Sequence, residues 1–115
     1  MKISFDEFRK LAFMIIAIMK EYERTGEDNV RQGDILNKMV TKIELDNPEK
    51  HTSLDRAQET SKKVKNVISY LINNENILMI SQDAKVKEDR FLTLNMNIDL
   101  ENLEGFLQGS KDPVY

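Results

Sequence analysis

Apolar residues recur at steps of three and four along the first quarter of the chain, the spacing that places side chains on one face of a helix. The repeat consists of Phe5, Phe8, Leu11, Ala12, Ile15, Ile16, Met19 and Tyr22. Ser4 precedes Glu7 by the spacing of a capping box, in which each side chain bonds a free backbone amide at the helix start. Gly26 can adopt the left-handed conformation that often ends a helix. The pattern therefore predicts a helix from about Ser4 to Thr25.

Two later segments show the same period. One helix is expected from about Gln32 to Ile43. Its inner face consists of Ile35, Leu36, Met39, Val40 and Ile43. Another is expected to follow a capping serine or threonine and to reach Asn73. Its core face consists of Leu54, Ala57, Ser61, Val64, Ile68, Leu71 and Ile72. A polar connection, Leu45–Thr52, separates the two helices, because the residue before Pro48 avoids helical geometry.

The period changes in the last third of the chain. Ile77–Ser81 and Phe91–Leu94 are short apolar runs, and the segment between them, Gln82–Arg90, is polar and charged. Two such runs around a flexible loop predict a β-hairpin. Asn29–Arg31 is too short for an independent strand but could add a brief edge to the same sheet.

The order helix, short strand, helix, helix and hairpin is that of a winged helix, a helix-turn-helix relative with a hairpin wing. Packing three helices against a small sheet closes one core. The expected fold is therefore α+β and mainly helical, a three-helix core with a small antiparallel β-hairpin as the wing. We assign residues 1–97 to this domain, 98–108 to a short C-terminal helix or extension, and 109–115 to a flexible tail.

The composition narrows the function. A chain of 115 residues can bury one modest core. Its longest apolar run, Leu11–Met19, is too short to span a bilayer, so we expect no membrane association. The sequence has no cysteine, which excludes disulfides, thiolate zinc sites and cysteine nucleophiles. An intracellular compartment is the simplest interpretation.

The negative charge is concentrated in one stretch. Between Glu44 and Glu59 lie five acids and two bases, a net charge of −3 that equals the charge of the whole chain at pH 7. Leu45 and Leu54 are aliphatic residues within it. A rim of carboxylates around such anchors suits a partner protein with basic and aliphatic side chains. An ordinary polar loop with its leucines turned inward is the alternative. The expected partner-binding residues are Glu44, Leu45, Asp46, Glu49, Leu54, Asp55, Gln58 and Glu59.

No catalytic or metal site is expected. His51, the only histidine, lies in the polar connection, without a partner for acid–base catalysis or enough ligands for a metal. The acids near it lack the spacing of a calcium-binding loop. The glycines form no phosphate-binding loop, and the serines have no glycine-flanked elbow. We therefore expect neither enzymatic activity nor a cofactor.

Binding of duplex DNA is the alternative function. In helix-turn-helix proteins the last helix enters the major groove, and here that helix and the wing carry several bases. The candidate DNA-contacting residues are Arg56, Lys62, Lys63, Lys65, Lys85 and Lys87. The same residues fit the solvated side of an amphipathic helix. Acids such as Glu59 and Glu88 alternate with them and weaken the field that releases counterions, so we expect little or no DNA binding.

Four short motifs in a fixed order carry a family resemblance. They are Ile3–Phe8 (ISFDEF), Gly33–Asn37 (GDILN), Lys65–Ile72 (KNVISYLI) and Arg90–Asn97 (RFLTLNMN). Together they resemble the C-terminal winged-helix domain of the sixth subunit of the eukaryotic minichromosome maintenance (MCM) replicative helicase. Met96 stands where that family has a proline.

The resemblance implies a docking role. In that family the domain binds the C-terminal winged helix of the replication licensing factor (Cdt family) during helicase loading, through acids between the second and third helices. Glu44 matches one such acid. The connection Asp46–Ser53 is longer than the usual form, so the nearest positions for the other contacts are Leu54, Asp55 and Arg56–Gln58.

The resemblance also implies a nuclear protein. The parent would be an ATP-dependent helicase subunit whose ATPase motifs lie upstream, and other helicase subunits would be partners through the full-length chain. We expect the isolated domain to be a monomer. A third hypothesis is a purely structural domain that packs on its parent through the broad apolar face of the first helix.

Overall fold

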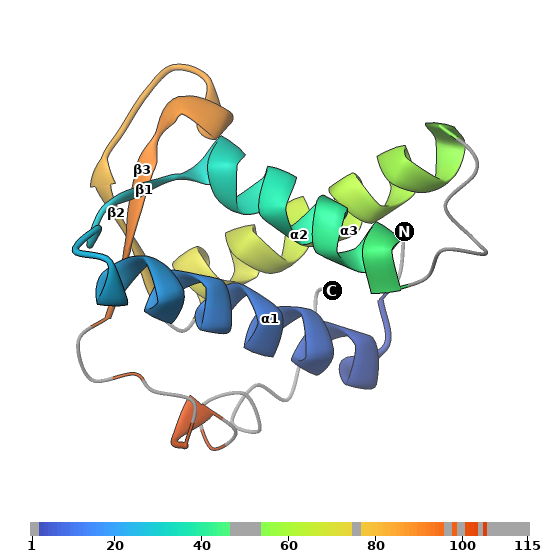
Figure 1. The fold of residues 1–115 in the computed structure, drawn as a ribbon, viewed down its shortest axis with the longest axis horizontal. Helices are drawn as coiled ribbons and strands as arrows, with labels where there is room; N and C mark the ends of the chain where they lie inside the picture. Colours follow the sequence, from blue (N-terminus) through green and yellow to red (C-terminus); the bar gives the residue numbers. More distant parts are fainter. Residues whose placement is uncertain are drawn as a thin grey trace.

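The fold contains three helices and one small sheet, in a computed structural model that describes residues 3–46, 54–74, 77–95, 98, 101–103 and 105. The elements in chain order are α1 (Phe5–Arg24), β1 (Val30–Arg31), α2 (Gln32–Asp46), α3 (Leu54–Asn73), β2 (Leu78–Gln82), the 3-10 helix η1 (Lys87–Asp89) and β3 (Phe91–Leu94). In Figure 1, α1 and α2 run side by side in front of α3, and the sheet lies at one end of the helices. This is the winged-helix arrangement that the sequence predicts.

The ends of α1 follow the local sequence signals. The Glu7 backbone N–H donates to Ser4 Oγ at 3.1 Å, which is the predicted N-cap. Thr25 caps the other end, and Gly26 follows it with a φ of +89°, a conformation that glycine adopts without strain. The predicted limits of this helix are thus correct to within one residue at each end.

The end of α2 differs from the prediction. The helix continues to Asp46, so Leu45 and Asp46 belong to its last turn and not to the connection. The restriction imposed by Pro48 falls on the residue immediately before it and therefore does not reach Asp46. The rest of the predicted connection, including His51, lies outside the described residues.

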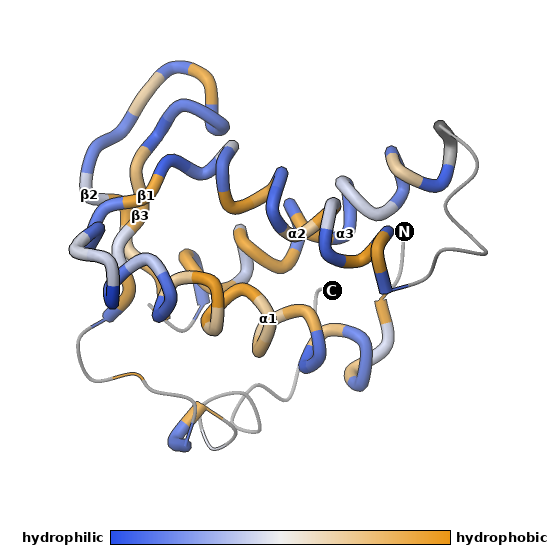
Figure 2. Tube along the Cα trace, in the orientation of Figure 1, coloured by the Kyte–Doolittle hydropathy of each residue, from blue (hydrophilic) through white to orange (hydrophobic). Residues whose placement is uncertain are grey.

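The core lies where α1, α2 and α3 face one another and the sheet. Its largest fully buried side chains are Phe8, Ile15, Ile16, Met19, Ile35, Met39, Ile68, Leu71, Ile77, Leu78, Leu92 and Ile98. Figure 2 shows the apolar stretches of the three helices turned toward this interior. Ile98 and Leu103 are buried in the same cluster, and the division of the chain at residue 97 stays a prediction.

The predicted core face of α3 was incomplete. Val67 and Tyr70 are buried as well as Val64 and Ile68. Tyr70 meets the ring of Phe8 from α1 edge-on, with ring centroids 4.9 Å apart. Because both α1 and β2 contact α3, its buried face is wider than a stripe against one neighbour, and its periodicity alone does not reveal that width.

The sheet has the strand order β1-β3-β2 and is antiparallel throughout. Val30 of the edge strand β1 pairs with Leu92, as the expected brief addition to the sheet. The hairpin is shifted slightly from the prediction, because β2 begins at Leu78 and continues past a bulge to Gln82. The wing loop, expected to be flexible throughout, includes the turn η1, which packs against α2.

Candidate functional site

The last turn of α2 brings together the first three of the predicted partner-binding residues. Leu45 has 74% of its surface exposed, although it is a large aliphatic residue. Asp46 is exposed beside it, and Glu44 is half-buried. Among the described residues, neither carboxylate has an ion-pair partner. This turn therefore carries an aliphatic side chain between two acids that are unpaired within the described part of the chain.

The other predicted partner-binding residues are placed less completely. Gln58 and Glu59 are exposed on the first half of α3, where Glu59 Oε1 lies 3.9 Å from Lys63 Nζ. The backbone of Leu54 and Asp55 opens α3, but their side chains and Glu49 fall outside what the structure describes. The predicted residues whose side chains the structure describes therefore lie at the end of α2 and on the first half of α3.

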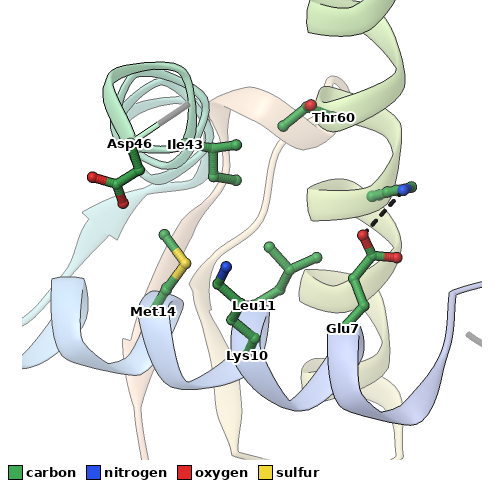
Figure 3. Close-up of a pocket in the computed structure, with 8 residues that line it drawn as sticks. Glu7, Lys10, Leu11, Met14, Ile43, Asp46 and Thr60 are labelled. Atoms are coloured by element: carbon green, nitrogen blue, oxygen red, sulfur yellow. Dashed lines mark hydrogen bonds and ion pairs between the residues drawn. The ribbon is translucent and has the colours of Figure 1, made fainter. Parts of the chain in front are cut away.

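A pocket of about 190 Å³ lies between α1, α2 and α3 next to this turn (Figure 3). It is lined by Glu7, Lys10, Leu11, Met14, Ile43, Asp46, Thr60 and Lys63. Lys63 Nζ closes one wall by pairing with Glu7 Oε2 at 3.1 Å. Asp46 stands at the α2 side of the pocket, above Met14. Sequence reasoning did not include the α1 residues of this pocket in the candidate site.

A second depression, shallow and about 410 Å³ in volume, lies on the outer side of α2. It is lined by Ile18, Asn37, Lys38, Thr41, Lys42 and Leu45. Lys38 Nζ sits 4.2 Å from the ring centroid of Tyr22, a cation–π contact that holds this side chain along α1. Leu45 is thus close to both pockets: it lines this one, and its neighbour Asp46 lines the other.

Two of the lysines that could contact DNA lie next to carboxylates of the same chain. Lys63 contacts Glu7 and Glu59, and Lys65 Nζ lies 3.2 Å from Glu88 Oε1 in the wing. The pKa of Glu88 is lowered, first by a hydrogen bond from its own backbone N–H and then by the hydrogen bond from Lys65. This part of α3 therefore faces a carboxylate of its own wing. The other candidates, Arg56, Lys62, Lys85 and Lys87, are exposed.

A cluster at the start of α2 fastens the wing to the helices. Arg31 Nη1 donates to the Glu88 carbonyl oxygen at 3.0 Å and to Asp89 Oδ1 at 3.2 Å, and Arg31 Nη2 donates to Asp34 Oδ1 at 3.1 Å. The guanidinium lies over Gly33, where an added Cβ would be only 2.7 Å from Arg31 Nη1. We call these contacts, together with the link described next, the wing clamp.

The second link of the wing clamp joins a half-buried arginine to a buried glutamine. Arg90 Nε donates to Gln32 Oε1 at 2.6 Å, and the Gln32 backbone N–H donates to the Arg90 carbonyl oxygen at 2.8 Å. Only 3% of Gln32 is exposed, and it is the single buried polar residue of the described core. Since buried polar groups require hydrogen-bond partners, this pair fixes the root of the wing.

Two general features complete the description of the site. Within the described residues, no three histidine or acidic side chains come together as a metal-ion site would require. No helix in the same part of the chain has the length and apolar character needed to cross a membrane.

Comparisons with known proteins identify one family. A family model described as the MCM6 C-terminal winged-helix domain matches residues 1–102, which is most of the chain. A search of curated proteins and a search of solved structures each found no match.

Proposed function

This chain belongs to the family of MCM6 C-terminal winged-helix domains, and from that premise we propose that it is the docking site for the C-terminal winged helix of the replication licensing factor (Cdt family). Membership makes the chain a winged-helix domain of a helicase subunit in the MCM complex, with a role in DNA replication. A winged helix is a binding module and not a catalytic fold. The proposal concerns the partner and the surface that holds it.

One observation supports this surface above the others. The last turn of α2 exposes Leu45 between Glu44 and Asp46, and both acids lack an ion-pair partner among the described residues. An exposed aliphatic side chain with unpaired carboxylates on both sides is suited to a basic partner that also carries an aliphatic residue. Glu59, another acid of the predicted set, is exposed on the first half of α3.

The chemistry of the contact follows from this arrangement. Rim carboxylates attract a basic surface over a distance and raise the association rate, while the desolvated leucine supplies contact energy at the centre. The apolar floor of the neighbouring pocket, formed by Leu11, Met14 and Ile43, can take the stem of a long basic side chain beside Asp46. We further propose a nuclear location and a parent chain with ATP-dependent helicase activity.

An NMR titration with the licensing factor's C-terminal domain tests the proposal. We expect shifts at Glu44–Asp46 and on the first half of α3. The double variant Glu44→Lys/Asp46→Lys should bind at least about tenfold more weakly, or about 1.4 kcal/mol, because two attractive contacts become repulsive. The matched control Glu27→Lys/Asp28→Lys makes the same charge change in the exposed loop after α1 and should bind almost normally.

Unchanged affinity in the α2 double variant would contradict the proposal. Duplex DNA forms the second arm of the titration. The DNA alternative requires affinity that falls steeply with salt and a slope that becomes shallower when Lys62, Lys63 and Lys65 are replaced by alanine. Because Lys63 and Lys65 already face carboxylates of the same chain, we expect this arm to show only weak binding.

A further inference from the structure

The outer side of α2 carries a groove of which the proposed function uses only Leu45. We propose that this groove is a second docking site, of opposite charge, which binds an acidic amphipathic helix of a partner protein. The groove is lined by Ile18 of α1 and by Asn37, Lys38, Thr41, Lys42 and Leu45 of α2. We refer to it as the basic groove.

The floor of the basic groove is apolar and accessible. Leu45 has 74% of its surface exposed, and the side chain of Ile18, only 8% exposed, reaches the surface at the groove. When a partner's aliphatic side chain covers exposed aliphatic surface of this kind, the free energy of the complex is lowered. Thr41 and the aliphatic stems of Lys38 and Lys42 extend the contact surface between the two apolar residues.

The charge of the groove selects the partner. Lys38 and Lys42 both line it, and no carboxylate does among the described residues. Neither lysine has an ion-pair partner in the described part of the chain. Lys38 is already held against the ring of Tyr22, at 4.2 Å, so less side-chain entropy is lost when a carboxylate binds it. The complementary ligand carries acidic groups on either side of an aliphatic anchor.

The dimensions of the groove favour a helix as the ligand. The lining residues of α2 recur one turn apart, as Asn37 and Lys38, then Thr41 and Lys42, then Leu45. From position 37 to position 45 this stripe covers about 12 Å along the helix axis, roughly two turns. A helix that lies along such a stripe presents side chains at i and i+4 to the same groove, which is the usual form of helix-in-groove recognition.

The basic groove and the acidic site are separable surfaces. Asp46 lines the pocket between the three helices, where it lies on α2 above Met14 (Figure 3), whereas Lys38 and Lys42 line the depression on the outer side of α2. Leu45 lies at the boundary between them. The inference does not rest on the proposed function, because its two lysines take no part in the acidic site.

A designed pair of stapled helical peptides tests the basic groove. One carries two leucines four residues apart with glutamates one turn away on either side, and the other has lysines in place of the glutamates. We expect the glutamate peptide to bind saturably with amide shifts at Ile18, Lys38, Thr41 and Leu45. The lysine peptide should bind at least about tenfold more weakly at this groove.

Variants of the domain locate the contact. Lys38→Glu/Lys42→Glu should lose at least about tenfold in affinity for the glutamate peptide, and Leu45→Ala should weaken it as well. The control Lys62→Glu/Lys85→Glu makes the same charge change at exposed positions outside the groove and should bind normally. An unchanged pattern of amide shifts in each free variant shows that it is folded.

The outcomes separate cleanly. The proposal is overturned if the glutamate peptide gives no saturable shifts at the groove, if both peptides bind there equally, or if the control variant loses as much affinity as the groove variant. Glu44→Lys/Asp46→Lys should not weaken the glutamate peptide. In turn, Lys38→Glu/Lys42→Glu should not weaken the licensing factor's domain, so failure of either surface is distinguishable from failure of the other.

Discussion

The face formed by α3 and the wing and the outer face of α2 are both rich in charged residues, but they use their charges differently. On the first face, Lys63 and Lys65 lie close to Glu7, Glu59 and Glu88. On the second, the described residues provide no ion-pair partner for Lys38 or Lys42. A DNA-binding winged helix would use the lysines of the first face, and here two of them, Lys63 and Lys65, already face carboxylates of the same chain.

The comparison teaches that a count of charges does not locate a binding surface. A lysine that already lies near a carboxylate must exchange that contact for a new one, so its net contribution to binding is small. A lysine or an acid without an ion-pair partner gives up only its bound water when a partner protein binds. Charges that the fold leaves unpaired remain open to partners, and in the described part of the chain Lys38, Lys42, Glu44 and Asp46 of α2 are among them.

The largest effect on stability is expected from removing the hydrogen bond between Arg90 and Gln32 in the wing clamp. Gln32→Ala deletes the acceptor of the Arg90 Nε–H and leaves that donor without its 2.6 Å partner. Loss of a partner for a buried or charged donor costs about 1–3 kcal/mol. We expect the free energy of unfolding, measured in urea, to fall by that amount.

The matched control is a substitution on the outer face of α2. Asn37→Ala changes an exposed position of the same helix and should alter the unfolding free energy by less than about 0.5 kcal/mol. Equal losses in the two variants would show that the wing clamp contributes no more stability than an ordinary surface residue.

A smaller effect is expected from the exposed contact between the wing and α3. Glu88→Gln removes the carboxylate that pairs with Lys65, and such exposed pairs contribute up to about 1 kcal/mol at neutral pH. Because folding lowers the pKa of Glu88, its contribution is present above the ordinary carboxyl pKa and is lost as the pH falls through the lowered value. Urea unfolding of the variant and the wild type should therefore differ at pH 7 and converge in acid. A difference that stays constant with pH would mean that the charge of Glu88 is not involved.

The smallest effect is expected on the outer face of α2. Lys42→Ala removes an exposed charge that has no ion-pair partner among the described residues, and it should change the unfolding free energy by less than about 0.5 kcal/mol at low and high salt alike. A loss above 1 kcal/mol that disappears at high salt would reveal an ion pair made by Lys42 and would weaken the contrast between the two faces.

Local features of the fold could be predicted from the sequence, and long-range ones could not. The cap at Ser4 and the turn at Gly26 depend on a few neighbouring residues, so their spacing is sufficient to predict them. The widths of buried faces depend on what packs against them, and Val67 and Tyr70 were missed for that reason.

The candidate site was predictable only in part. The acids and Leu45 at the end of α2 were found from charge and composition, because they follow one another in the chain. The ion pair of Lys65 with Glu88 and the contacts of Arg31 with Asp89 join residues far apart in sequence. No local pattern indicates that these charges neutralise one another. The basic groove is likewise not visible in the sequence, because residues of both α1 and α2 line it.

The absence of a side chain at Gly33 has a consequence for the whole wing. Gly33 lies in the first turn of α2, and glycine generally favours a helix less than alanine does. Its Cβ would occupy the space that the Arg31 guanidinium fills, and a displaced guanidinium would release the Glu88 carbonyl oxygen and Asp89 together. Gly33 thus leaves room for a neighbouring arginine to reach across to the wing, and this contact adds to the pairing of β1 with β3 and to the Arg90–Gln32 bond in holding the hairpin.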